Sequence, residues 1–119
     1  MKSATLITSL GAILALGTQA AMATCYGSGP EWPDKSQALG FIRDACSKTN
    51  GMFTGGFNPL QTKWMCPHSK DIGLLFEIQN LNNVGTYNLD DNECITRLSN
   101  EINGCSHGGE SSISGWRFR

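Results

Sequence analysis

Five cysteines constrain the fold of this 119-residue chain more than any other feature of its sequence. All five lie after a start that is typical of an exported protein. Met1-Lys2 is basic, residues 6–16 form an uncharged apolar run, and Ala21-Met22-Ala23 is a small-residue cleavage motif. The sequence therefore predicts a signal peptide over 1–23 and a mature domain over 24–119, secreted into an oxidising extracellular compartment.

The spacing of these cysteines favours disulfide bonds over a metal site. They are Cys25, Cys46, Cys66, Cys94 and Cys105. No C-x-x-C pair occurs, which excludes the usual zinc-ribbon and thioredoxin-like motifs. Only two histidines are present to complete a Cys/His zinc site, so we expect no metal. The spacing alone leaves the pairing open.

An odd number of cysteines leaves one thiol without a partner in the same chain. Either that thiol pairs with another chain, or the sequence stops short of a sixth cysteine. The chain ends on Gly115-Trp-Arg-Phe-Arg119, which alternates like a strand and stops without a turn. We therefore expect a domain that is truncated at its C-terminus.

Charge excludes two classes of partner. Residues 24–119 carry eight basic and ten acidic side chains, a net charge of 8 − 10 = −2. Binding to nucleic-acid phosphates or to anionic lipid needs a basic surface, so neither partner is expected. The apolar run over 6–16 is too short to span a bilayer, and no second run follows it. Membrane insertion is therefore not expected.

Hydrophobic periodicity predicts two helices, each with an aspartate as its N-cap. Asp34 precedes the first helix, which Asn50-Gly51 should close, and its apolar positions are Ala38, Leu39, Ile42, Ala45 and Cys46. Asp90 precedes the second helix, which Gly104 should end, and its apolar positions are Cys94, Leu98 and Ile102.

About four strands are expected, over residues 52–57, 74–79, 84–89 and 116–119. Within the best of them, Leu74, Phe76 and Ile78 should point one way, and Glu77 and Gln79 the other. Segments 24–33, 58–68 and 106–114 should be loops. Asn82-Asn83 predicts a hairpin turn between 74–79 and 84–89. Short turns between neighbouring strands imply antiparallel pairing. The predicted fold is a small, single-domain α+β two-layer sandwich, with two helices packed on one sheet and disulfides supplementing the core.

The candidates for catalysis do not form a complete site. Gly104-Cys-Ser-His-Gly108 matches G-x-S-x-G, but a helix precedes it and a loop follows, whereas a nucleophile elbow joins a strand to a helix. No aspartate follows Ser106 to complete a triad. His107 and Glu110 have no third partner nearby for a metal or acid–base role. We therefore expect no enzymatic activity.

The three tryptophans are better candidates for function. Each either packs in the core or offers a face for stacking on a sugar ring. Trp116 in the last strand should be core, whereas Trp64 in a proline-containing loop should be exposed. A carbohydrate site would combine Trp64 and His68 with His107 and Glu110 of the glycine loop, since these side chains can donate and accept hydrogen bonds. The alternative is that His107 and Glu110 only tie the turn to the second helix.

Three blocks near the C-terminus carry a resemblance: Asn92-Glu-Cys94 through Leu98, Glu101-Ile-Asn-Gly-Cys105-Ser-His-Gly-Gly-Glu110, and Gly115-Trp-Arg-Phe118. They resemble a family of small secreted fungal proteins, the ink-cap mushroom "Y-three" type lectins. The resemblance covers most of 24–119 and is specific over 92–118. The family pattern continues into a proline–glycine turn and a final cysteine, whereas this chain ends at Arg119.

This resemblance implies a single-domain α/β sandwich that binds glycans or glycoproteins without a cofactor, and it makes a homodimer an expected form. The alternative is a secreted effector or killer-toxin-like protein that binds a host or competitor protein.

Overall fold

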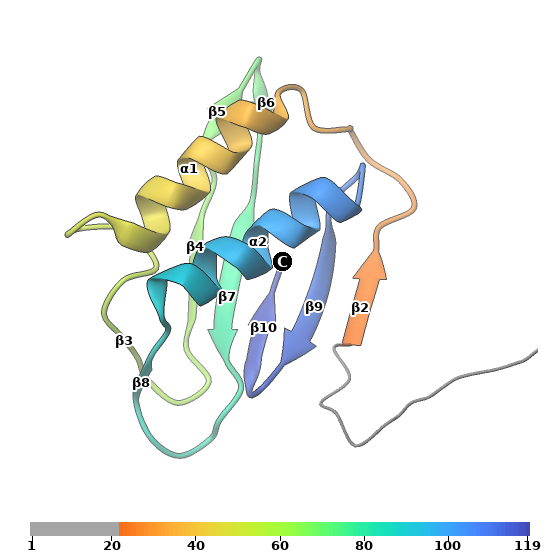
Figure 1. The fold of residues 1–119 in the computed structure, drawn as a ribbon. Coiled ribbons are helices and arrows are strands. Elements are labelled where there is room, and N and C mark those ends of the chain that lie inside the picture. Colours follow the sequence, from red (N-terminus) through yellow and green to blue (C-terminus); the bar gives the residue numbers. More distant parts are fainter. Residues whose placement is uncertain (1–21) are drawn as a thin grey trace, which may run out of the picture.

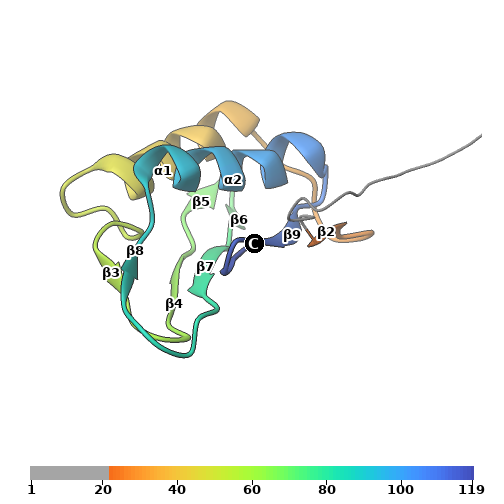
Figure 2. The same cartoon turned by 60° about the horizontal axis from the view of Figure 1, so that its bottom comes forward.

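Two helices lie on one face of an antiparallel sheet in the computed structural model, which describes residues 22–119 (Figure 1). The helices are α1 (Lys35–Ser47) and α2 (Asp91–Gly104). The sheet has the order β2-β9-β10-β7-β4, formed by Met22–Cys25, Gly109–Ile113, Trp116–Phe118, Phe76–Asn80 and Thr62–Met65. Both views place the two helices on the same side of this sheet (Figure 2). The α+β two-layer fold is thus as predicted, with one strand more than expected.

Two further pairs of short strands extend from this framework. Strands β3 (Gly56–Phe57) and β8 (Tyr87–Asn88) pair antiparallel, as do β5 (His68–Ser69) and β6 (Ile72–Gly73). Among residues 22–119, no helix is long and apolar enough to cross a membrane.

Both predicted helix starts are confirmed by their caps. The Asp34 carboxylate accepts a hydrogen bond from the N–H of Gln37 at 3.0 Å. The Asp90 carboxylate accepts two, from the N–H groups of Asn92 and Glu93. These bonds satisfy amide groups that have no partner within the helix.

The first helix ends at Ser47, before the predicted stop at Asn50-Gly51. Gly51 has another role, because a Cβ there would overlap the backbone carbonyls of Asp44 and Ala45. The chain after the helix thus folds back against the last turn of α1, and the Phe53 N–H donates to the Ala45 carbonyl.

The core lies between the helices and the sheet. It is made by the buried stripes of both helices together with Phe53, Phe57, Leu74, Phe76, Ile78, Leu89 and Phe118. Leu39 is only partly buried, whereas the other predicted apolar positions of both helices are buried. The disulfide Cys46–Cys94 joins α1 to α2 inside this core, and Cys25–Cys105 joins β2 to the residue after α2. Cys66 is the remaining cysteine, and it is free and exposed.

Two segments predicted as loops are strands of the main sheet. Strand β4 lies within 58–68, and β9 within 106–114. Strand β9 escaped prediction because its inward positions carry small residues instead of large apolar ones. A Cβ on Gly109 would come within 3 Å of the Thr24 carbonyl oxygen and the Cys105 sulfur, so close packing requires glycine there.

The predicted hairpin between 74–79 and 84–89 is wrong. Strand β7 pairs instead with β4 and β10, and 84–89 supplies only β8, which pairs with β3. The cause is Asn80, which is fully buried. Its side-chain amide donates to the carbonyls of Phe57, Asn58 and Gly85, and it thereby directs the chain away from the sheet. The predicted strand 52–57 is likewise reduced to Gly56–Phe57.

At the N-terminal end, residues 1–21 of the predicted signal peptide lie outside the described residues. Met22 and Ala23 lie inside β2, where they pair with Ser112 and Ser111 of β9. Thr24 and Cys25 complete this strand, so the predicted loop over 24–33 begins later than expected. Cleavage after Ala23 would remove half of β2 and leave Cys25 to anchor the rest through its disulfide.

Candidate functional site

The sheet face that points away from the helices carries polar side chains in two rows. Phe76, Ile78 and Phe118 are buried on the helix side, so the residues that alternate with them lie on the opposite side. The strand registers place one row as Thr24, Glu110, Arg119, Glu77 and Trp64, and the other as Ser112, Arg117, Gln79 and Thr62. We call these nine residues the polar face. No described helix covers it (Figure 2).

Ion pairs connect the middle of the polar face. Arg119 Nε lies 3.3 Å from Glu77 Oε1 and 3.9 Å from Glu110 Oε1. Arg117 Nη1 lies 3.6 Å from Glu110 Oε2, and Arg117 Nε donates to Gln79 Oε1 at 3.1 Å. Two carboxylates thus balance two guanidinium groups, and this face has no formal net charge.

Tyr26 closes one end of this network. Its hydroxyl donates to Glu110 Oε1 at 3.4 Å and accepts from Arg119 Nε at 3.1 Å. Burial acts to lower the pKa of Arg119, but the hydrogen bond with Tyr26 and the charges of Glu77 and Glu110 outweigh it and raise that pKa. Arg119 therefore stays charged and fixed among its partners.

Trp64 lies at the other end of the row, on the edge strand β4 and opposite Glu77. It is 57% exposed, as predicted, although it belongs to a strand and not to a loop. Trp116 is partly buried against the core, where its ring meets Phe57 edge to face. Trp64 is therefore the indole available to a ligand on the polar face.

The four residues predicted for a carbohydrate site separate into two groups. Trp64 and Glu110 share the polar face, three strand spacings apart, which is about 14 Å at 4.8 Å per strand. His68 lies in the β5–β6 hairpin, outside the five-stranded sheet. His107 lies in the turn after α2, where its Nδ1 is 2.7 Å from the carbonyl oxygen of Gly29. Since a carbonyl only accepts, Nδ1 carries the hydrogen.

Sequence reasoning missed five members of the network: Tyr26, Glu77, Gln79, Arg117 and Arg119. Part of the signal was present, because alternation places Glu77 opposite the buried Phe76 and Ile78. Arg117 and Arg119 alternate in the same way around Phe118. The alternation of polar and apolar residues does not show which strands lie side by side.

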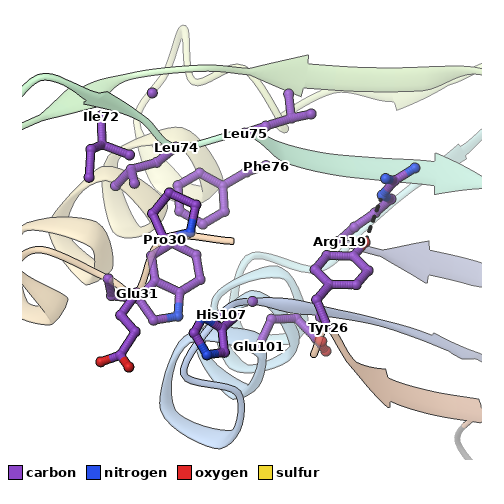
Figure 3. Close-up of a pocket in the computed structure, with 14 residues that line it drawn as sticks. Tyr26, Pro30, Glu31, Ile72, Leu74, Leu75, Phe76, Glu101, His107 and Arg119 are labelled. Atoms are coloured by element: carbon purple, nitrogen blue, oxygen red, sulfur yellow. Dashed lines mark hydrogen bonds between the residues drawn. The ribbon is translucent and has the colours of Figure 1, made fainter. Parts of the chain in front are cut away.

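A pocket of about 200 Å³ adjoins the polar face at Arg119, which belongs to both, and it is also lined by Tyr26, the hydrogen-bond partner of Arg119 and Glu110. Figure 3 shows side chains from three regions around it: the segment that carries Pro30 and Glu31, residues 72–76, and the chain at Glu101 and His107. The Trp32 ring stacks on Phe76 with centroids 5.7 Å apart, and its Nε1 donates to the Cys105 carbonyl at 2.8 Å. These contacts give the pocket a fixed aromatic wall.

Glu101 is the buried titratable group of this pocket, with 6% of its surface exposed. Burial raises the pKa of Glu101, and the charge of Glu110 adds to this, while the hydrogen bond from Ser111 opposes it. The Ser111 hydroxyl donates to Glu101 Oε2 at 2.7 Å.

Comparison with other proteins adds no assignment: the chain matches no protein-family model and no curated relative. Over residues 22–119, no three histidine, cysteine, aspartate or glutamate side chains gather as a metal site would need. Function must therefore be argued from the geometry of the polar face and the pocket.

Proposed function

We propose that this protein is a secreted, non-catalytic glycan-binding protein of lectin type, and that its ligand lies across the polar face. The observation that carries the proposal is the exposed indole of Trp64 in one cross-strand row with Glu77, Arg119 and Glu110. Secretion is supported by two disulfides, which persist in oxidising compartments, and by the signal peptide that the sequence predicts.

The chemistry of the row suits sugars. An indole face packs against the apolar side of a sugar ring, and the carboxylates and guanidinium groups beside it accept and donate hydrogen bonds to hydroxyls. The absence of formal net charge on this face favours neutral glycans over strongly anionic ones. Ion pairs hold the side chains in place before a ligand arrives, which reduces the entropy lost on binding.

A glycan array with the secreted domain tests the proposal, followed by calorimetric titration of the strongest ligand. Trp64→Ala should weaken binding by roughly tenfold or more and leave the melting temperature nearly unchanged, because the side chain is exposed on an edge strand. Tyr87→Ala is the matched control, since Tyr87 is an aromatic residue that is 48% exposed but lies in β8, outside the polar face. Chelation of metal ions should have no effect.

The proposal fails if Trp64→Ala and Tyr87→Ala bind glycans equally well. Failure of the array itself, together with specific binding to a host or competitor protein, would support the effector or toxin-like alternative instead.

A further inference from the structure

The pocket beside the polar face lies between Gly108 and two aromatic rings, those of Trp32 and Tyr26. A Cβ on Gly108 would lie 3.5 Å from Trp32 Cζ2 and 3.7 Å from Tyr26 Cδ2, so both rings border the space above this residue. Gly108 has φ +80°, a conformation that side chains disfavour. The same backbone that makes the turn therefore keeps this space open.

The Glu101 carboxyl closes one end of that space. Its Oε1 would lie 3.0 Å from a Cβ on Gly109, which also lines the pocket. Figure 3 shows the Glu101 carboxyl group between His107 and Tyr26. Among the described residues, Ser111 is the one that donates a hydrogen bond to this carboxyl, and it does so at Oε2. Oε1 thus keeps its acceptor capacity for a ligand.

No described cation pairs with Glu101. The nearest guanidinium that lines the pocket, that of Arg119, is shared between Glu77 and Glu110. In Figure 3 this guanidinium lies beyond the Tyr26 hydroxyl, on the side away from Glu101. The other acidic groups near the pocket are Glu31, which lines it, and Glu110, whose charge acts on Glu101. A negatively charged ligand would therefore meet repulsion, and a neutral one would leave Glu101 without a counter-charge.

We propose that this pocket binds a small organic ammonium ion with a flat apolar body, whose ammonium group faces Glu101. Aromatic side chains attract cations over their faces, and the Glu101 carboxylate supplies the counter-charge and a hydrogen-bond acceptor. In its neutral form His107, which donates through Nδ1 to Gly29, offers its other ring nitrogen as a second acceptor. The volume suffices for one ring, since a cavity of about 150 Å³ in another protein holds benzene.

The site is tested by titrating the secreted domain with benzylamine and, separately, with its neutral counterpart benzyl alcohol. Two-dimensional NMR spectra record which residues each probe affects and how tightly it binds. Benzylamine should shift the Trp32 indole N–H and the Gly108 amide, and bind roughly tenfold more tightly than benzyl alcohol. Glu101→Gln should abolish that preference while keeping an acceptor for Ser111. Glu93→Gln, which removes a partly exposed carboxylate of the same helix, should leave the preference intact.

A second measurement needs no variant. Affinity for benzylamine should fall as the pH is lowered, because protonation of Glu101 removes the counter-charge, whereas affinity for benzyl alcohol should change little. Equal binding of the two probes, shifts located elsewhere, or the absence of shifts in the unmodified protein would each overturn the proposal. These outcomes are distinguishable from a failure of the glycan proposal, because Glu101 lies on the helix side of the sheet with Ser111, whereas the glycan test rests on Trp64 of the polar face.

Discussion

Replacing Cys46 and Cys94 together by alanine should cost about 3 kcal/mol or more of unfolding free energy. This bridge closes a loop of 48 residues inside the 80-residue loop of Cys25–Cys105. With the outer bridge intact, the unfolded chain connects the two sulfurs by paths of 48 and 32 residues, since 80 less 48 leaves 32. Two flexible paths that join the same two sulfurs restrain them as strongly as a single loop of about 19 residues would. Closing a loop of that length stabilises the folded state by about 3.3 kcal/mol when the disulfide acts through chain entropy.

Burial adds to this cost. Both cysteines are 1% exposed in the core between α1 and α2, so alanine leaves a cavity there. A domain of this size has a total stability of roughly 5–15 kcal/mol, and the variant should therefore fold but unfold at clearly lower urea concentration.

Urea unfolding followed by circular dichroism, without reductant, measures the change. The m-value should rise, because the unfolded chain expands when the inner bridge is absent. Cys66→Ala is the control: Cys66 is free and exposed, so its loss should change the unfolding free energy by less than about 0.5 kcal/mol. A loss below about 1 kcal/mol in the double variant, with an unchanged m-value, would show that this loop-entropy reasoning is wrong.

Three further predictions concern local interactions. Asp90→Ala and Asp34→Ala should each cost about 0.5–2 kcal/mol in urea unfolding through loss of the N-caps; neutrality at both would contradict the cap assignment. Asn80→Ala should cost about 2–4 kcal/mol in the same assay, because it removes a fully buried amide that donates to three backbone carbonyls, of which that of Phe57 is buried; a loss under about 1 kcal/mol would count against this role. The pKa of Glu101 is raised in the folded protein above its ordinary value of 4.5, so the folded state keeps this proton at a pH where the unfolded chain has lost it. The contribution of Glu101 should therefore make the free energy of unfolding fall as the pH rises from the unfolded pKa to the folded pKa. Thermal melting across pH should show a smaller fall in Glu101→Gln, and an identical pH profile in the two proteins would refute the assignment.

The helices and the best strand could be predicted because their causes are local. Asp34 and Asp90 bond to amides only two or three residues away, and the apolar stripes behind them repeat with the helical period. Phe76 and Ile78 alternate with the polar Glu77 and Gln79, and both are buried together with Leu74, as predicted. Exposure of Trp64 was predicted as well, because a large aromatic stood among turn-forming residues.

The sequence by itself thus determined the fold class, the two helix starts, the buried strand and the presence of disulfides. Tertiary structure alone decided which cysteines pair, which strands flank β7, and that Gly109–Ile113 is a strand. The physical reason is the distance along the chain between the residues that interact. Packing between segments far apart in the sequence decides which strands are neighbours, and small inward residues such as Gly109 give no alternating apolar pattern. The polar face depends on four such registers at once, and these bring Trp64 and Glu110 into one row while they leave His68 and His107 outside it.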